Sequence, residues 1–151
     1  MTTKHLLIVL LLIIVSCGQE QNPKQPEPLP IVGTWKLISA TTIKEDSTIE
    51  SDLSNKSMIK IINNSHFSFL NHDIHKGKDS LAFFASGGGK YKLTGHKYTE
   101  FLEYCNFRNW EDNTFEFTVE VRGDTLIQSG IEKVDEAGVD HKIIETYIRF
   151  K

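Results

Sequence analysis

The sequence predicts an all-β domain over residues 31–151, an up-and-down antiparallel β-barrel of about eight to ten strands. Short segments with apolar residues at alternate positions are separated by turn-forming residues, and no segment keeps a helical period for more than a turn or two. No proline follows Pro30, so every later segment is free to form a fully hydrogen-bonded strand. Because so many strands would leave edges exposed, we expect the sheet to close into a barrel.

The residues before this domain are typical of an exported, lipid-anchored protein. Lys4 supplies a short positive region, and Leu6 to Val15 form an apolar stretch too short to span a bilayer as a helix. The stretch ends in Ile-Val-Ser-Cys17, which resembles the bacterial lipobox, whose cysteine is lipidated. We therefore predict a lipoprotein signal peptide over residues 1–16 and lipid on Cys17. The alternative is an ordinary secretory signal with a chance cysteine.

Residues 17–30 read as a tether between the lipid and the domain. All four prolines lie here among polar residues, so the stretch cannot bury enough surface to fold. We expect the protein to be anchored in the bacterial cell envelope, at the outer membrane, with its domain in the periplasm or at the cell surface. With Cys17 lipidated, Cys105 has no disulfide partner, and it reads as a small residue at a strand end.

The expected strands follow one another along the domain. They cover residues 31–43, 57–62, 66–70, 81–85, 90–93, 97–104, 114–121, 125–131 and 141–150. The polar residues 44–56 are long enough for a loop or a short lid helix. Three glycines, Gly87 to Gly89, predict a tight turn or a bulge that needs positive φ.

The first strand carries the motif Gly33-x-Trp35, with Trp35 and Leu37 on one face. We expect glycine at position 33 because the strand bends there or is closely approached. A Gly-x-Trp at the start of a β domain resembles the first-strand motif of lipocalins and their calycin relatives. That resemblance implies that Trp35 plugs the closed end of the barrel and that a basic residue of the last strand, here Arg149, lies over it.

Two later stretches extend this resemblance. Residues 87–104 run from a glycine-led Gly-x-Tyr strand through a turn to Tyr-Thr-Glu and Glu-Tyr, and residues 145–149 read Glu-Thr-Tyr-Ile-Arg. Together with the segment Gly123-Asp-Thr-Leu, they are similar to lipocalin-like lipoproteins of the Bacteroidetes type. The resemblance covers nearly all of residues 31–151, and it implies a fold rather than a particular activity.

Two strand faces supply the candidate ligand-binding residues. They are Tyr98, Glu100 and Tyr104 on one strand and Glu145, Tyr147 and Arg149 on another. If both faces point inward, they combine polar groups with an apolar lining, as ligand pockets do. Arg149 would then pair with Glu100, with Glu145 or with an anionic group of the ligand, because buried charges need partners. The alternative is that one or both faces point to solvent.

Other classes of function have less support. The net charge of −3 and the absence of a basic run argue against nucleic-acid binding. His66, His72 and His75 lie in or beside a polar loop without accompanying Cys or Glu, so we predict no metal site, although His72-x-x-His75 could hold one on a helical turn. No nucleophile–base pair is identifiable, so we expect neither catalytic residues nor a cofactor.

The sequence therefore predicts a membrane-anchored lipocalin-like lipoprotein that binds a small hydrophobic or amphipathic ligand inside the barrel. The alternative is a structural or protein-interaction lipoprotein whose barrel is filled by its own side chains.

Overall fold

A computed structural model describes residues 29–151 of the chain. The predicted signal peptide, most of the tether and Cys17 lie outside these residues. The described part is built almost entirely from strands: β1 (Gly33–Lys44), β2 (Ser47–Glu50), β3 (Lys56–Ile62), β4 (His66–Asp73), β5 (Phe84–Thr94), β6 (Lys97–Cys105), β7 (Asn113–Arg122), β8 (Thr125–Val134) and β9 (Val139–Arg149). Two short 3₁₀ helices are η1 (Arg108–Trp110) and η2 (Asp135–Ala137). Within this part of the chain, no helix is long and apolar enough to cross a bilayer.

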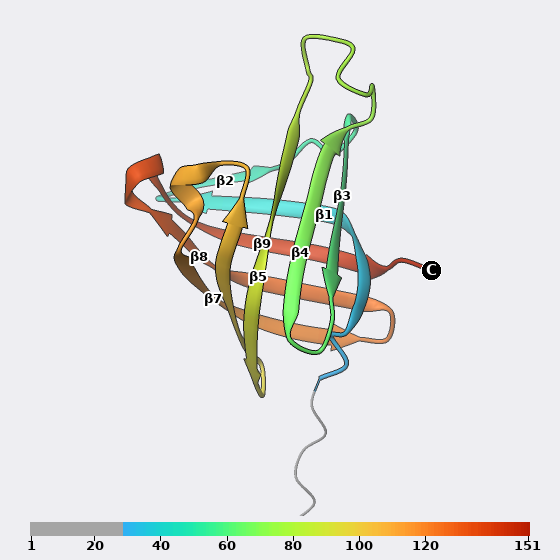
Figure 1. The fold of residues 1–151 in the computed structure, drawn as a ribbon, viewed down its shortest axis with the longest axis vertical. Helices are drawn as coiled ribbons and strands as arrows, with labels where there is room; N and C mark the ends of the chain where they lie inside the picture. The colour runs from blue at the N-terminus through green and yellow to red at the C-terminus, as the bar shows by residue number, and fades with distance from the viewer. Residues whose placement is uncertain (1–28) are drawn as a thin grey trace, which may run out of the picture.

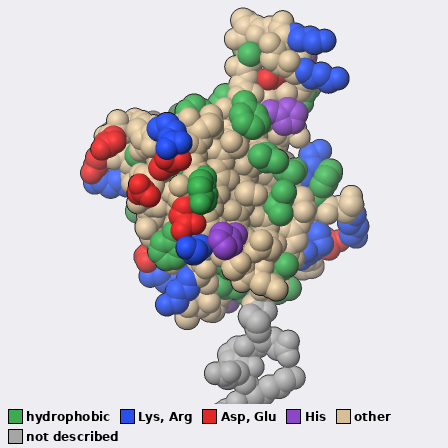
Figure 2. All heavy atoms as spheres, in the orientation of Figure 1, with side chains coloured by type: hydrophobic (Ala, Val, Ile, Leu, Met, Phe, Trp, Pro, Cys, Tyr) green, Lys and Arg blue, Asp and Glu red, His purple; other side chains and the backbone are tan. Residues whose placement is uncertain are grey.

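The strands form one closed antiparallel barrel, which confirms the predicted fold class (Figure 1). From β3 to β9 each strand pairs with the next along the chain, and β1 closes the barrel by pairing with both β3 and β9. The barrel thus has eight strands in up-and-down order, and β2 is an additional strand on β1. The loop between β4 and β5 projects from one edge as a knob with basic side chains on it (Figure 2).

One edge of strand β1 pairs with two different strands, β3 and β2. Its first residues, Gly33 to Lys36, pair with β3, and its last residues, Thr41 to Lys44, pair with β2. Between them Ile38 is an extra residue relative to β9, because Leu37 faces Tyr147 and Ser39 faces Thr146. Such a bulge bends the strand. Residues 56–58 of β3, which precede Ile59, have no partner in β1, so the wall is not continuously paired at this end.

Two segments differ from the sequence-based expectation. Residues 44–56, expected to be a loop or lid helix, contain the hairpin strand β2. The expected strand 90–93 and the last two residues of the expected strand 81–85 belong to one long strand, β5, that runs straight through the three glycines, whereas residues 81–83 lie in the preceding loop. The tight turn predicted at the glycines is therefore wrong, while a register shift does occur between Gly88 and Gly89.

The three glycines are needed for close approach rather than for positive φ, which none of them adopts. A Cβ atom on Gly89 would lie 1.9 Å from the carbonyl oxygen of Phe101, and one on Gly88 would lie 2.6 Å from that of Phe67. Backbone atoms of the flanking strands therefore occupy the space that a side chain would need.

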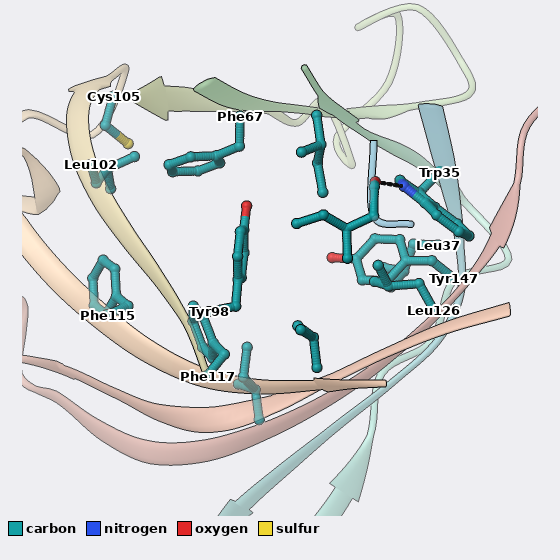
Figure 3. Close-up of a cluster of buried hydrophobic side chains, with 14 of the residues drawn as sticks. Trp35, Leu37, Phe67, Tyr98, Leu102, Cys105, Phe115, Phe117, Leu126 and Tyr147 are labelled. Atoms are coloured by element: carbon teal, nitrogen blue, oxygen red, sulfur yellow. Dashed lines mark hydrogen bonds between the residues drawn. The ribbon is translucent and has the colours of Figure 1, made fainter. Parts of the chain in front are cut away.

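The barrel core is filled at one end and in the middle by aromatic side chains (Figure 3). At the closed end Trp35 and Tyr147 are fully buried, and the Trp35 indole donates a hydrogen bond of 2.7 Å to the carbonyl oxygen of Ile31. The ring of Tyr98 stands in the middle of the barrel, between Phe67 and Phe117. Burial of each such side chain stabilises the fold by about 1.5–3 kcal/mol. The other half of the barrel, toward η1, is less completely filled.

Candidate functional site

A cavity of about 230 Å³ lies in the half of the barrel that ends at η1. Side chains from β3, β4, β5, β6, β8, β9 and the η1 region line it: Met58, Lys60, Phe69, Asn71, Ala85, Glu100, Cys105, Phe107, Trp110, Gln128, Glu132 and Glu145. At about 30 Å³ per molecule, the volume corresponds to roughly eight waters. The cavity thus has room for a small molecule.

The innermost part of the cavity is built around a buried lysine. Lys60 is 2% exposed, and its Nζ donates hydrogen bonds to Glu100 Oε1 at 2.7 Å and to Gln128 Oε1 at 2.9 Å. The lysine points inward because residues two positions apart in a strand share a face, and Lys60 lies between Met58 and the buried Ile62 on the inner face of β3. A buried charge of this kind is stable only when it is paired and hydrogen-bonded, as it is here.

Aromatic rings surround the same ammonium group. The Lys60 Nζ lies 5.7 Å from the ring centroids of both Phe67 and Tyr147, 5.9 Å from that of Tyr98 and 6.0 Å from that of Phe117. These distances are at the outer limit of cation–π interaction. The rings therefore hold the lysine side chain in place chiefly by packing, and the carboxylate and amide oxygens hold its charge.

Glu145 lies next to this centre on β9, opposite Gln128 of β8. Its Oε2 accepts a hydrogen bond of 2.6 Å from the Tyr147 hydroxyl and a longer one of 3.5 Å from the Gln128 amide. Burial raises the pKa of Glu145, while the charge of Lys60 acts in the opposite direction. Burial also raises the pKa of Tyr147 well above its ordinary value, so its hydroxyl keeps its proton as a donor.

Glu132 is the third carboxylate of the cavity. Its Oε2 is 3.2 Å from Nε2 of His141 across the β8–β9 pair. Burial, reinforced by repulsion from Glu145, raises the pKa of Glu132 to about 7. This group therefore changes its charge near neutral pH, which an ordinary exposed glutamate does not.

The outer part of the cavity is apolar, apart from one amide. Met58, Phe69, Phe107 and Trp110 supply its wall. Between them the Asn71 Oδ1 atom is buried without a hydrogen-bond partner. A buried acceptor without a donor costs free energy, so a bound molecule with an N–H or O–H group would satisfy it.

The structure brings four of the predicted ligand-binding residues together inside the barrel. Tyr98 is 1% exposed, Glu100 is 6% exposed, and Glu145 and Tyr147 form the hydrogen-bonded pair already described. Glu100 and Glu145 line the cavity, whereas the two tyrosines pack beneath it. Burial raises the pKa of Tyr98, and the hydroxyl has no hydrogen-bond partner.

The expectation that Tyr104 shares this inward face is wrong. Its side chain is 70% exposed, on the outside of the barrel. The cause is the register shift between β5 and β6, where Gly88 pairs with Tyr104 but Gly89 pairs with Leu102, so that Glu103 is an extra residue. One inserted residue reverses the alternation of the strand. Cys105 therefore points inward in place of Tyr104.

Arg149 is not the counter-ion of the interior carboxylates, which corrects that part of the prediction. Its guanidinium carbon lies 4.1 Å from the centroid of the Trp35 ring at the closed end, as the Gly-x-Trp motif predicted. It donates hydrogen bonds of 3.0 Å each to the carbonyl oxygens of Val32 and Pro30. Gly33 makes room for it, because a Cβ at that position would lie 2.5 Å from the guanidinium.

Sequence reasoning missed Lys60, Gln128 and Glu132. Lys60 sits in the run Ser-Met-Ile-Lys-Ile-Ile, where apolar residues on both faces of the strand conceal its direction. Gln128 and Glu132 share one face of β8 with Leu126 and Val134, both of which are buried. Counting in steps of two from Leu126 to Val134 would have placed both polar residues inside.

The predicted histidine cluster does not converge. His72 contacts the carbonyl oxygen of Asp73 at 2.6 Å, His66 contacts the Ser65 hydroxyl at 2.8 Å, and His75 lies beside Asn55 and Asp79. In residues 29–151 no group of three or more His, Cys, Asp or Glu side chains is arranged to hold a metal ion.

No known protein family matches the chain, and no curated protein is detectably similar to it in sequence.

Proposed function

We propose that this protein is a lipocalin-like lipoprotein of the cell envelope that binds a small molecule inside its barrel. The observation that carries the proposal is the cavity of about 230 Å³, which has an apolar outer wall and a polar inner end. Ligand pockets combine these two features, an apolar lining for affinity and a few convergent polar groups for orientation.

Two features of the fold support the lipocalin-like assignment. The barrel has eight strands in up-and-down order and closes on itself through β1 and β9. At its closed end Arg149 covers the Trp35 ring, in the arrangement that the first-strand motif implies for lipocalins.

The size of the cavity limits the ligand. Pockets for drug-sized molecules usually enclose about 300–1,000 Å³, so this one suits a smaller compound. Buried side chains occupy the rest of the interior, with Trp35 and Tyr147 in the closed half and Tyr98 in the middle of the barrel. A barrel that served only as a structural support would gain stability by filling the second half with apolar side chains, since buried charges are costly. Retention of charged groups beside an empty space favours binding over structural support.

Native mass spectrometry of the full-length lipoprotein, purified from its own cells in mild detergent, tests the binding function. We expect a mass excess of a small molecule that disappears when the protein is denatured. Protein that carries no such excess, and that remains empty after incubation with a metabolite extract of the same cells, would contradict the proposal and favour the filled-barrel alternative.

The membrane anchor is proposed from the lipobox-like sequence around Cys17. We expect Cys17→Ala to release the protein into the soluble fraction, because lipid on this residue is the proposed anchor. Cys105→Ala is the matched control, since Cys105 is buried in the barrel and its loss should leave the protein attached. If the Cys17→Ala protein stays with the membrane after a high-salt wash, the anchor lies elsewhere.

A further inference from the structure

When its carboxyl groups are ionised, the cavity carries more negative charge than its own basic residue neutralises. Lys60 is the single lysine or arginine among the residues that line it, whereas Glu100, Glu132 and Glu145 supply three carboxylates. One positive charge against three negative charges leaves a net charge of −2 when all are ionised. Even a protonated His141, which contacts Glu132, leaves one negative charge in excess.

The hydrogen bonds show which carboxylates are unmatched. Glu100 has the Lys60 ammonium at 2.7 Å. Glu145, in contrast, receives hydrogen bonds only from the neutral Tyr147 hydroxyl and the neutral Gln128 amide. A partly buried carboxylate with no cation hydrogen-bonded to it is costly, and a cation that enters the cavity would reduce that cost.

We propose that the cavity binds a small organic cation, an aralkyl- or alkylamine, whose ammonium group is held by Glu145 and Glu132. The inference rests on the proposed ligand-binding function and names the class of ligand. An ammonium has three N–H donors and no acceptor. The buried Asn71 Oδ1, which lacks a donor, lines the same cavity from β4, across the barrel from β8, where it can accept a hydrogen bond from another donor of the ligand.

The outer wall suits the rest of such a molecule. Phe69, Phe107 and Trp110 provide aromatic surface against which a short hydrocarbon or aryl group would pack. An anionic ligand would meet the excess of carboxylates, and a neutral one would bury them further without a partner. The arrangement of charge and apolar surface therefore selects an amine with an apolar body.

Protons and amines should compete for the same carboxylates. The titratable groups that face the site are Lys60 from β3, Tyr98 and Glu100 from β6, Cys105 at the end of β6, Glu132 from β8, and His141, Glu145 and Tyr147 from β9. Burial and mutual repulsion raise the pKa of Glu132 and that of Glu145. Binding of an ammonium stabilises their ionised forms, so it should release protons at neutral pH.

Three probes with the same phenyl-ethyl frame test the class of ligand: phenethylamine, phenethyl alcohol and 3-phenylpropionate. Each is titrated by calorimetry into the full-length protein in non-ionic detergent at pH 7, after any native ligand has been dialysed away. We expect phenethylamine to bind at least about tenfold more tightly than the alcohol, and the acid not to bind. Calorimetry in two buffers of different ionisation enthalpy should show proton release with the amine alone.

Matched variants locate the effect. Glu145→Gln keeps the shape of the side chain and should weaken phenethylamine binding by about tenfold or more, with a smaller change for the alcohol. Glu132→Gln is the second variant, should Glu145→Gln fail to fold. The control is Glu116→Gln, which removes an equal charge from the outer face of β7, where the carboxylate is exposed and paired with Lys97. It should leave the affinity unchanged.

Several results would overturn the inference. They are failure of phenethylamine to bind, equal or tighter binding of the alcohol or the acid, and equal losses in Glu145→Gln and Glu116→Gln. The native ligand separates this inference from the function on which it rests. If the mass excess of the purified protein proves to be a neutral or anionic compound, binding stands and the amine class is wrong. A protein that is empty and binds none of the probes would overturn both.

Discussion

Replacing Lys60 by Met tests whether the buried ion pair is the electrostatic centre of the barrel. Methionine fills nearly the same volume, so the change chiefly removes the charge that lies 2.7 Å from Glu100. Glu100 is 6% exposed, and without Lys60 it would face Glu145 and Glu132 with no cation of β3 beside it. Removing one partner of a buried ion pair costs about 3–5 kcal/mol, because the other charge is left uncompensated. We expect Lys60→Met to lose this much unfolding free energy.

The opposite substitution should cost less. In Glu100→Gln, Lys60 keeps the Gln128 oxygen at 2.9 Å, and Glu145 remains nearby as a counter-charge. The new glutamine also retains an acceptor in the same place. We therefore expect a loss of about 1–2 kcal/mol, the size expected for one weakened hydrogen bond. The asymmetry between the two substitutions follows directly from the excess of carboxylates.

Urea unfolding at pH 7.5, followed by tryptophan fluorescence, measures both free energies. Lys97→Met is the control, because Lys97 forms a pair of similar length, 2.6 Å, with Glu116 on the barrel exterior, where the side chains are 56% and 61% exposed. Such exposed pairs contribute little, so the control should change stability by less than about 0.5 kcal/mol. If Lys60→Met costs no more than Lys97→Met, or less than Glu100→Gln, the reasoning about the buried charges is refuted.

Three further predictions concern the closed end, the glycine strand and pH. Arg149→Met should lose about 1–3 kcal/mol and shift the Trp35 emission, because a cation–π contact and two hydrogen bonds disappear; unchanged stability and emission would count against the contact. Gly89→Ala should lower the free energy of unfolding by about 3 kcal/mol or more, since its Cβ would meet a carbonyl oxygen at 1.9 Å. Gly95→Ala has open space around it and a φ of +59°, so it should lose only about 1–2 kcal/mol. Thermal melts measure both, and equal losses would contradict this reading. The folded-state pKa of Glu132, about 7, exceeds its ordinary value of 4.5, so the folded protein binds the proton more tightly. Stability should therefore be greatest below about pH 4.5 with respect to this group and be lost as the pH rises through about 7, by at most about 3 kcal/mol given its partial exposure. Glu132→Gln should flatten that dependence in urea titrations between pH 5 and 8, and an unchanged slope would show that another group is responsible.

Much of the fold could be predicted because strands are local in sequence. The segment Thr114 to Val121 alternates strictly, and β7 covers it, with Phe115, Phe117 and Val119 buried. The connections at Gly95 and Gly123 adopt the positive φ values that their turns need. The Gly33-x-Trp35 motif indicated the contact with Arg149 through its resemblance to a family in which the two ends of the chain meet.

The interior of the cavity could not be predicted in the same way, because it depends on register between distant strands. A single extra residue, Glu103, turned Tyr104 outward and Cys105 inward. The three glycines indicated a bulge in this region, but no local pattern shows that the extra residue lies in β6 at Glu103. Sequence alternation alone showed which residues share a strand face, but only within an uninterrupted strand. The charge of Lys60 is stabilised by Glu100 and Gln128, which lie 40 and 68 positions away in the sequence. The sequence alone thus predicted most of the strands, the turns at Gly95 and Gly123 and the closed end. The pairing of buried charges was decided only when the barrel closed and brought β3, β6 and β8 around one point.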